Sequence, residues 1–165
     1  MGKRRSVILD TNILVYAIRP DDCNDDRAKR AKDFISDISR DDEADILIPA
    51  VVVAEFLCGC DSGFEDAVRN LQEHFKIVPF DMNAACQYRQ VVTTRRRRSG
   101  SDQDETKQVA AAERNTVDEM IVATALAARA QELITYDQGL INLAKAVGID
   151  AKEPPELGLG LLPGF

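Results

Sequence analysis

The chain alternates between two patterns of apolar residues. Short runs that are apolar at nearly every position predict strands covered on both faces, as in a parallel sheet. Longer stretches with an apolar residue at every third or fourth position predict amphipathic helices. The expected strands cover residues 7–9, 46–48, 76–80 and 132–136, with a last edge strand at 148–152.

The helical stretches fall between these runs, so strands and helices alternate over the whole chain. This order is typical of a three-layer α/β fold with a mainly parallel central sheet. Residues 1–152 are expected to form one domain, and residues 153–165 a tail to which the pattern assigns no structure. The expected helices cover residues 13–17, 25–40, 50–58, 64–75, 81–92, 106–114, 116–128 and 138–147.

A polar stretch at residues 93–105 predicts a solvated loop, and it begins with a run of arginines. Two interpretations of this run stay open: a charged helix end favoured by the helix dipole, or a set of phosphate contacts. Beyond the loop, Thr116 and Glu119 have the spacing of a capping box, which predicts that a new helix starts there. The arginines are Arg95, Arg96, Arg97 and Arg98.

Composition narrows the class of protein. A chain of 165 residues with 45% hydrophobic content suits one domain with a sizeable core. No run approaches the ~18 apolar residues of a membrane helix, and no secretory pattern opens the chain, so a cytoplasmic protein is expected. The four cysteines are not needed as disulfide staples, and the single histidine, His74, leaves little basis for a zinc site.

Four carboxylates stand where the α/β pattern brings helix starts toward one edge of the sheet. Asp10 directly follows the first strand, and Asp137 repeats that arrangement after the strand at 132–136. Each is also well placed as a plain helix cap, so both interpretations stay open. In open parallel sheets, however, ligands bind beyond the carboxyl ends of the strands, which is where Asp10 is expected.

The other two carboxylates lie in helices with apolar neighbours. Glu55 is the only charge in the stretch 50–58, and an unpaired carboxylate there must meet a cation, hydrogen bonds or water in a cleft. Asp118 lies three, four and seven residues before Ile121, Val122 and Ala125, which places it on the apolar side of its helix.

Carboxylates that converge at one edge repel one another and protonate unless a cation is present. A site made only of oxygen ligands suits Mg²⁺ or Mn²⁺, and metal-assisted phosphodiester hydrolysis is the natural chemistry. The net charge of −7 argues against a protein that simply coats nucleic acid. It does not exclude a nuclease, because bound cations present positive charge to the phosphate.

Several motifs together resemble those of PIN-domain ribonucleases, in particular VapC-like toxins. No single motif is specific, but their joint order and spacing are, and the resemblance extends from Val7 to about Asp150. The motifs are Asp10-Thr11-Asn12 after a strand, Glu55 within 54–56, the stretch 118–125 that begins with Asp118, Thr135-Tyr136-Asp137, and the third strand with its end at 77–81.

The resemblance implies an endoribonuclease dependent on Mg²⁺ or Mn²⁺, often a homodimer, whose acidic groove is occupied by the tail of a small antitoxin. Two departures stand out: the segment 95–114 is longer than usual, and Asp137 is followed by Gln-Gly-Leu instead of the usual aspartate and phenylalanine. The implied principal carboxylates are Asp10, Glu55 and Asp118, with Asp137 as a fourth that acts through water and Thr11, Asn12 and Thr135 in support.

Two other functions remain to be weighed. In a PIN-like binding module the acids would merely cap helices, and the domain would dock RNA or protein without cutting. In a phosphotransfer enzyme Asp10 would be the nucleophile, but such phosphatases usually carry a second aspartate two residues on, and this chain has Asn12.

Overall fold

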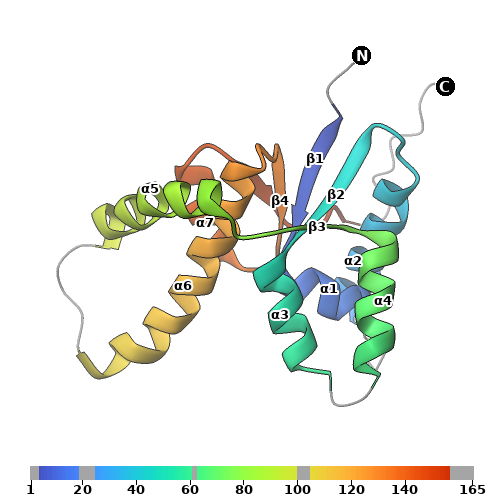
Figure 1. Cartoon of the computed structure of the whole chain (residues 1–165), viewed down its shortest axis with the longest axis horizontal. Helices are drawn as coiled ribbons and strands as arrows, with labels where there is room; N and C mark the ends of the chain where they lie inside the picture. Colours follow the sequence, from blue (N-terminus) through green and yellow to red (C-terminus); the bar gives the residue numbers. More distant parts are fainter. Residues whose placement is uncertain (1–3, 19–24, 61–62, 100–104, 157–165) are drawn as a thin grey trace.

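A parallel sheet forms the centre of the molecule (Figure 1). The structure is a computed structural model that describes residues 4–18, 25–60, 63–99 and 105–156, with the backbone alone at 99 and 105–114. In these residues the sheet has five strands in the order β3–β2–β1–β4–β5, and every neighbouring pair is parallel. The strands are β1 (Arg5–Leu9), β2 (Ala44–Pro49), β3 (Lys76–Val78), β4 (Glu132–Ile134) and β5 (Asp150–Lys152).

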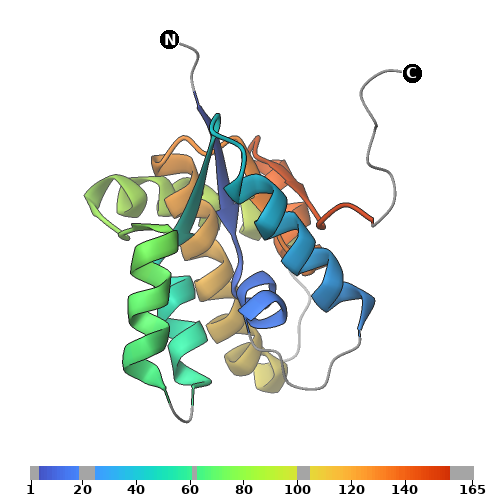
Figure 2. The same ribbon diagram turned by 90° about the vertical axis from the view of Figure 1, so that its right-hand side faces the viewer.

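Helices cover both faces of the sheet, as the alternating pattern predicts. Figures 1 and 2 show α1 and α2 on one face and α5, α6 and α7 on the other. The three-layer α/β fold with a parallel sheet is therefore confirmed. The helices are α1 (Thr11–Ile18), α2 (Asp26–Ser39), α3 (Ala50–Cys58), α4 (Phe64–His74), α5 (Met82–Ser99), α6 (Glu105–Ala127) and α7 (Gln138–Ala146).

The two central strands supply the middle of the core. Residues 7–9 of β1 are fully buried, and residues 46–48 of β2 are at most 8% exposed. Both faces of these strands lie under helices, which is why the sequence carries unbroken apolar runs there instead of an alternating pattern. On the helical side, Ile121, Val122 and Ala125 of α6 are buried as predicted.

The strand order fixes where a ligand can bind. From β1 the chain winds outward through β2 to β3, then returns across β1 to place β4 and β5 on the other side. The order therefore reverses between β1 and β4, and such a reversal opens a crevice at the carboxyl ends of the strands. Asp10 lies there, with its N–H donating to the carbonyl of Ile134 at 3.1 Å.

Three aspartates cap helix starts, and among them is Asp137, at which the sequence predicts a cap. The carboxylates of Asp25, Asp81 and Asp137 accept hydrogen bonds from backbone N–H groups at the starts of α2, α5 and α7. Each bond satisfies one donor that the first helical turn leaves unpaired. Pro79 directly follows the edge strand β3, a position that suits a residue unable to donate to a neighbouring strand.

Two predictions about the region around the arginine run are wrong. The loop expected from residue 93 is helical up to Ser99, and α6 runs unbroken from Glu105 to Ala127 without a new start at Thr116. Arginine has good helix propensity, and positive charge in the last turn of a helix is favoured by its dipole. Glu119 does not cap a helix start because its carboxylate is engaged by Tyr88 instead.

Other expectations have mixed outcomes. Phe64, one of the apolar residues behind the expected helix at 64–75, is 54% exposed at the first turn of α4, and His74 lies on the surface. Cys58, Cys60 and Cys86 form no disulfide among the described residues. Across the described ranges, no helix is long and apolar enough to cross a membrane.

Residues 19–24, 100–104 and 157–165 lie outside the described residues, and with them part of the predicted loop at 93–105 and most of the predicted tail at 153–165. The first residues of the expected tail are described, and they lie against α2. The guanidinium of Arg30 donates to the carbonyls of Pro154 and Pro155, the latter at 3.3 Å.

Candidate active site

An acidic pocket of about 410 Å³ opens at the carboxyl edge of the sheet. It brings together three carboxylates from distant parts of the chain, one after β1, one on α3 and one on α6. The sequence predicts this convergence from the positions of the acids alone. The lining residues are Asp10, Thr11, Asn12, Val15, Tyr16, Glu55 and Asp118.

Asp10 lies deepest in the pocket and is held by neutral donors. Its side chain is 6% exposed. One oxygen, Oδ1, accepts from the backbone N–H of Thr11 at 2.7 Å, and Oδ2 accepts from Asn12 Nδ2 and from the Thr135 hydroxyl, both at 2.6 Å. These donors come from α1 and from the end of β4, so the strand order itself brings them together around the carboxylate.

The environment of Asp10 makes its charge costly. Burial raises the pKa of Asp10 from 3.8 to about 6, and the nearby charges of Asp118 and Glu55 push it in the same direction. The hydrogen bonds from Thr135 and Thr11 oppose this shift without cancelling it. Near neutral pH the carboxylate is thus largely ionised at a free-energy cost, which a bound cation would offset.

Asn12 and Thr135 are themselves fixed by a small hydrogen-bond network. Asn12 Nδ2 donates to the Thr135 hydroxyl at 3.0 Å, and the N–H of Tyr136 donates to Asn12 Oδ1 at 3.2 Å. The hydroxyl of the fully buried Thr135 also accepts from the N–H of Asp137 at 2.9 Å. Both side chains therefore orient Asp10 and have little freedom to turn away.

Glu55 and Asp118 face the pocket from two helices and have different partners. Glu55 is exposed on α3, and its Oε2 accepts from the Thr11 hydroxyl at 2.5 Å. Asp118 is 25% exposed at its side chain, with Oδ2 3.2 Å from Arg95 Nη2. Burial raises the pKa of Asp118, the guanidinium of Arg95 opposes the shift, and the charges of Asp137 and Glu55 add to it.

Asp137 is the one predicted acid that does not line the pocket as described. Its Oδ1 accepts from the N–H of Leu140 at 2.9 Å and caps α7. A Cβ atom at Gly139 would come within 3.0 Å of that oxygen, so the unusual Gln-Gly-Leu sequence leaves room for the cap. Asp137 is still close enough to raise the pKa of Asp118.

The four arginines of the run have different surroundings. Arg95 enters the site, and Arg98 donates to the carbonyl of Asn142 on α7 at 3.3 Å. Arg96 and Arg97 are exposed, and Arg97 lines a shallow groove of about 380 Å³ along α5. The other residues that line this groove are Cys86, Arg89, Gln90, Thr93 and Thr94.

The sequence predicts Arg95 as a possible phosphate contact within the arginine run, but it did not predict the contact of Arg95 with Asp118. The signal was present, because Arg95 follows Val92, Val91 and Tyr88 by three, four and seven residues and so shares the inner face of α5 with them. The assignment of the whole run to a loop hid this periodicity.

The donor set of the pocket suits a hard divalent cation. Carboxylate, hydroxyl and amide oxygens are the ligands that Mg²⁺ and Mn²⁺ prefer, and Asp10, Glu55 and Asp118 could supply the charge. Within the described part of the chain, however, no three acidic, histidine or cysteine side chains are close enough to hold one ion as they stand. In this arrangement Glu55 accepts a hydrogen bond from Thr11, and Asp118 accepts one from Arg95.

The fold and the pocket define an α/β protein of the three-layer class with a cluster of acids at the reversal of strand order. A family model described as "PIN domain" matches residues 7–146, which is most of the chain. The chain therefore belongs to the PIN domain family, whose members are nuclease-like. No curated protein matches the chain.

Solved structures with the same fold include three toxin–antitoxin assemblies. VapBC2 from Rickettsia felis, bound to a promoter DNA fragment, has a TM-score of 0.63 at 17% identity and covers 90% of this chain and 98% of its own. VapBC-1 from nontypeable Haemophilus influenzae has a TM-score of 0.60 at 15% identity, covering 90% and 97%. A toxin–antitoxin complex from Klebsiella pneumoniae has a TM-score of 0.57 at 20% identity, covering 92% and 99%. At these identities the likeness is one of fold.

Proposed function

We propose that this protein is a metal-dependent endoribonuclease that hydrolyses RNA phosphodiester bonds and acts as the toxin of a toxin–antitoxin pair. One observation carries the proposal: Asp10, Glu55 and Asp118 line one pocket at the reversal of strand order. Buried acids with perturbed pKa values are typical of functional sites. The pKa of Asp10, raised to about 6, fits that description.

The proposed cofactor is Mg²⁺ or Mn²⁺, held by Asp10, Glu55 and Asp118. When bound, such an ion polarises the phosphoryl group and lowers the pKa of the attacking water. Asp10 contributes a carboxylate whose direction is fixed by Thr135 and Asn12. Asp137 lies within electrostatic reach of Asp118, so a water-mediated role as a fourth acid is proposed for it.

RNA as the substrate is supported by local charge. The chain carries a net charge of −7, which disfavours tight binding of nucleic acid over the whole surface. Arg96 and Arg97 are exposed on α5, and the groove beside them is lined by Arg89 and two threonines. Such side chains contact phosphates without reading the base sequence, so we propose that they orient the RNA backbone toward the pocket.

A partner protein and a second copy are also proposed. The structural neighbours from Rickettsia felis and Klebsiella pneumoniae are toxin–antitoxin assemblies, which supports a small antitoxin as the partner of this chain. A homodimer is proposed on the family resemblance. Light scattering of the purified chain decides the oligomeric state, and co-expression with a neighbouring small reading frame decides whether a stable complex forms.

The alternative function is a PIN-like module that binds RNA or protein without cutting. Two observations favour it: Glu55 and Asp118 already have partners in Thr11 and Arg95, and no three acids of the described residues are close enough to hold one ion. In this alternative, Glu55 and Asp118 serve only to form the hydrogen bond with Thr11 and the ion pair with Arg95, and they bind no metal.

A cleavage assay separates the two functions. Single-stranded and structured RNAs, with a matched DNA, are incubated with the metal-depleted chain and then with added Mg²⁺ or Mn²⁺. We expect cleavage of RNA only when the metal is present, and its loss in a folded Asp118→Asn variant. Equal cleavage by that variant would contradict the proposed site, and binding without cleavage would favour the alternative.

A further inference from the structure

Arg95 connects the arginine run to the acidic pocket. Its side chain is 18% exposed and points from α5 to three acceptors on α6. Nη2 lies 3.2 Å from Asp118 Oδ2, Nε lies 3.5 Å from Glu119 Oε1, and Nη1 donates to Asn115 Oδ1. Three neighbouring polar residues of one helix therefore share a single guanidinium.

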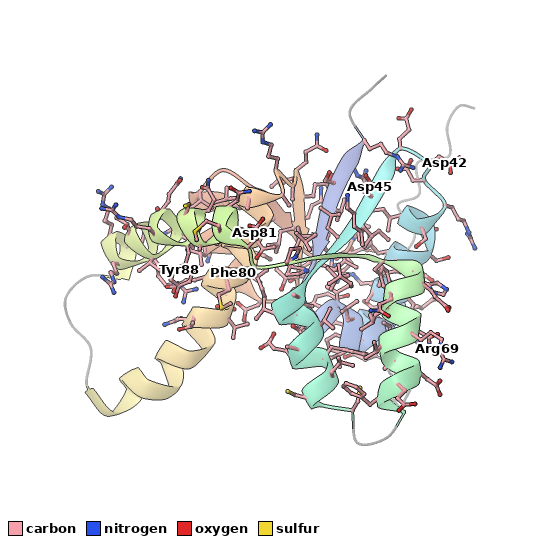
Figure 3. The ribbon with its side chains drawn as sticks, in the orientation of Figure 1. Asp42, Asp45, Arg69, Phe80, Asp81 and Tyr88 are labelled. Carbon is pink, nitrogen blue, oxygen red and sulfur yellow. The ribbon has the colours of Figure 1, made fainter. Side chains whose placement is uncertain are left out.

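Of these three acceptors only Asp118 lines the pocket, whereas Asn115 and Glu119 lie outside its lining. Glu119 is 7% exposed, and it also accepts from the Tyr88 hydroxyl at 2.9 Å. Tyr88 in turn packs edge-on against Phe80, with ring centroids 6.1 Å apart; both are labelled in Figure 3. Asp118, in contrast, lines the pocket. A guanidinium anchored by Glu119 and Asn115 would stay in place if Asp118 turned away.

We propose that Arg95 exchanges partners during the working cycle of the site. In the metal-free pocket it neutralises Asp118. With a metal bound, Asp118 would be a ligand of the ion, and the guanidinium, still anchored on α6, would be available to bind a phosphate of the RNA. This inference rests on the proposed function and extends it by naming a phosphate-binding residue and its competitor.

The charges around the pocket support an exchange of this kind. One carboxylate oxygen of Asp118 cannot be a close partner of a guanidinium and of a divalent cation at the same time. The two positive groups therefore compete for it. Once its neighbour is neutralised by the metal, Arg95 keeps its own charge, because a guanidinium does not lose its proton in proteins. A planar guanidinium beside a metal-bound site is well suited to bind a phosphate through two parallel hydrogen bonds.

Exchange predicts two opposite effects when the charge of Arg95 is removed. Metal should bind more tightly, because its competitor for Asp118 is gone. RNA should bind more weakly to the metal-loaded protein, because a phosphate ligand is lost. If Arg95 does not compete for Asp118, the gain in metal affinity should be no larger than that caused by removing another positive charge of the same run.

Calorimetric titration of Mn²⁺ into the metal-depleted full chain tests the first effect. Arg98→Gln is the matched control. Arg98 lies three residues after Arg95 on α5 and carries the same charge, but it contacts the carbonyl of Asn142 and not Asp118. For Arg95→Gln we expect Mn²⁺ affinity to rise about tenfold, the scale of one lost competing charge. Arg98→Gln should stay within about twofold of the parent, and Arg95→Lys, which keeps the charge, should fall between them. Thermal unfolding shows whether each variant is folded.

Fluorescence anisotropy tests the second effect, with a labelled single-stranded RNA and Ca²⁺ in place of Mg²⁺; a gel checks that the RNA stays intact. For Arg95→Gln we expect RNA affinity to fall roughly tenfold, with a shallower salt dependence than the Arg98→Gln control. Unchanged or weaker Mn²⁺ binding in Arg95→Gln, unchanged RNA binding, or no Mn²⁺ binding by the parent chain would each overturn the exchange.

The outcomes also separate this inference from the proposed function. If both effects occur but no RNA is cut under any metal, the exchange holds and the nuclease assignment fails. If RNA is cut but Arg95→Gln binds metal and RNA like the parent, the nuclease assignment holds and the exchange fails.

Discussion

The two sides of the acidic pocket hold their carboxylates in different ways. On the sheet side, Asp10 is buried and surrounded by neutral donors from Thr11, Asn12 and Thr135. On the helix side, Asp118 is more exposed and is paired with a full positive charge on Arg95. Neutral donors fix direction without removing charge, so Asp10 is oriented and stays in need of a cation. The guanidinium of Arg95 balances the charge of Asp118 for as long as the two side chains stay paired.

This difference assigns separate tasks to the two sides. The Asp10 side is built from elements that the sheet holds rigidly, namely the end of β1 and the end of β4. The Asp118 side is built from the contact between α5 and α6, two helices that pack together with no strand between them (Figure 1). We expect the first side to set the geometry of metal binding and the second to respond to what the pocket contains.

The largest effect is expected from Asp10→Asn. Loss of this charge should lower metal-dependent cleavage by about 10³-fold, the scale seen when one preorganised electrostatic group is removed. Initial rates of RNA cleavage at saturating Mn²⁺ measure it. An Asp118→Asn variant should lose activity on the same scale, because both acids are proposed ligands. If only one of the two variants loses activity, the other acid is not a metal ligand as proposed.

The second prediction concerns Thr135, which orients Asp10. Thr135→Val removes the 2.6 Å hydrogen bond to Oδ2 while nearly keeping the shape of the side chain. Loss of such an orienting partner should weaken Mn²⁺ affinity about 10–100-fold. Calorimetric titration measures this change. If Mn²⁺ affinity stays at the parent value, the view that neutral donors pre-orient Asp10 is wrong.

The third prediction is a pH dependence of stability in the metal-free chain. The pKa of Asp10 is about 6 when folded against 3.8 ordinarily, so the folded state binds the proton more tightly than the unfolded state. Stability from this group is therefore highest below pH 4 and falls as pH rises toward 6, by about 3 kcal/mol at most. Urea unfolding at several pH values, compared with Asp10→Asn, isolates the contribution.

Two controls sharpen this pH prediction. In Asp10→Asn the fall in stability between pH 4 and 6 should be smaller than in the parent. Added Mn²⁺ at pH 7.5 should restore stability to the parent but not to the variant, since a bound cation favours the ionised carboxylate. An identical pH slope in both proteins would show that Asp10 titrates as an ordinary exposed acid.

The smallest effect is expected at Gly139, beside the cap of α7. Gly139→Ala places a Cβ atom 3.0 Å from Asp137 Oδ1 and should cost about 1 kcal/mol of unfolding free energy. Chemical denaturation measures it. Cleavage should change little if Asp137 is mainly a cap. A large loss of activity at unchanged stability would instead support the proposed water-mediated role of Asp137.

Much of the fold could be predicted from the sequence because local signals agree with the tertiary structure. The unbroken apolar runs at 7–9 and 46–48 can only be covered on both faces, and that requires a parallel sheet with helices on each side. Once that sheet is assumed, Asp10, Glu55 and Asp118 converge without further information, because each follows or faces a carboxyl end.

The sequence was misleading where a tertiary contact overrides a local signal. Thr116 and Glu119 have capping-box spacing, but Glu119 bonds to Tyr88 on another helix, so the helix continues through the predicted start. Arg95 looked like one of four solvated arginines because the partners that bury it are twenty or more residues away. Local patterns carry no information about such partners.

The connection between β1 and α1 limits how this protein can be re-engineered. Leu9 ends the strand and Thr11 begins the helix, so Asp10 alone forms the link. An inserted or deleted residue there would turn the carboxylate out of register with Thr135 and slide α1 along the sheet. Changes in chain length intended to alter substrate choice are therefore better placed away from this link and from the contact between Arg95 and Asp118.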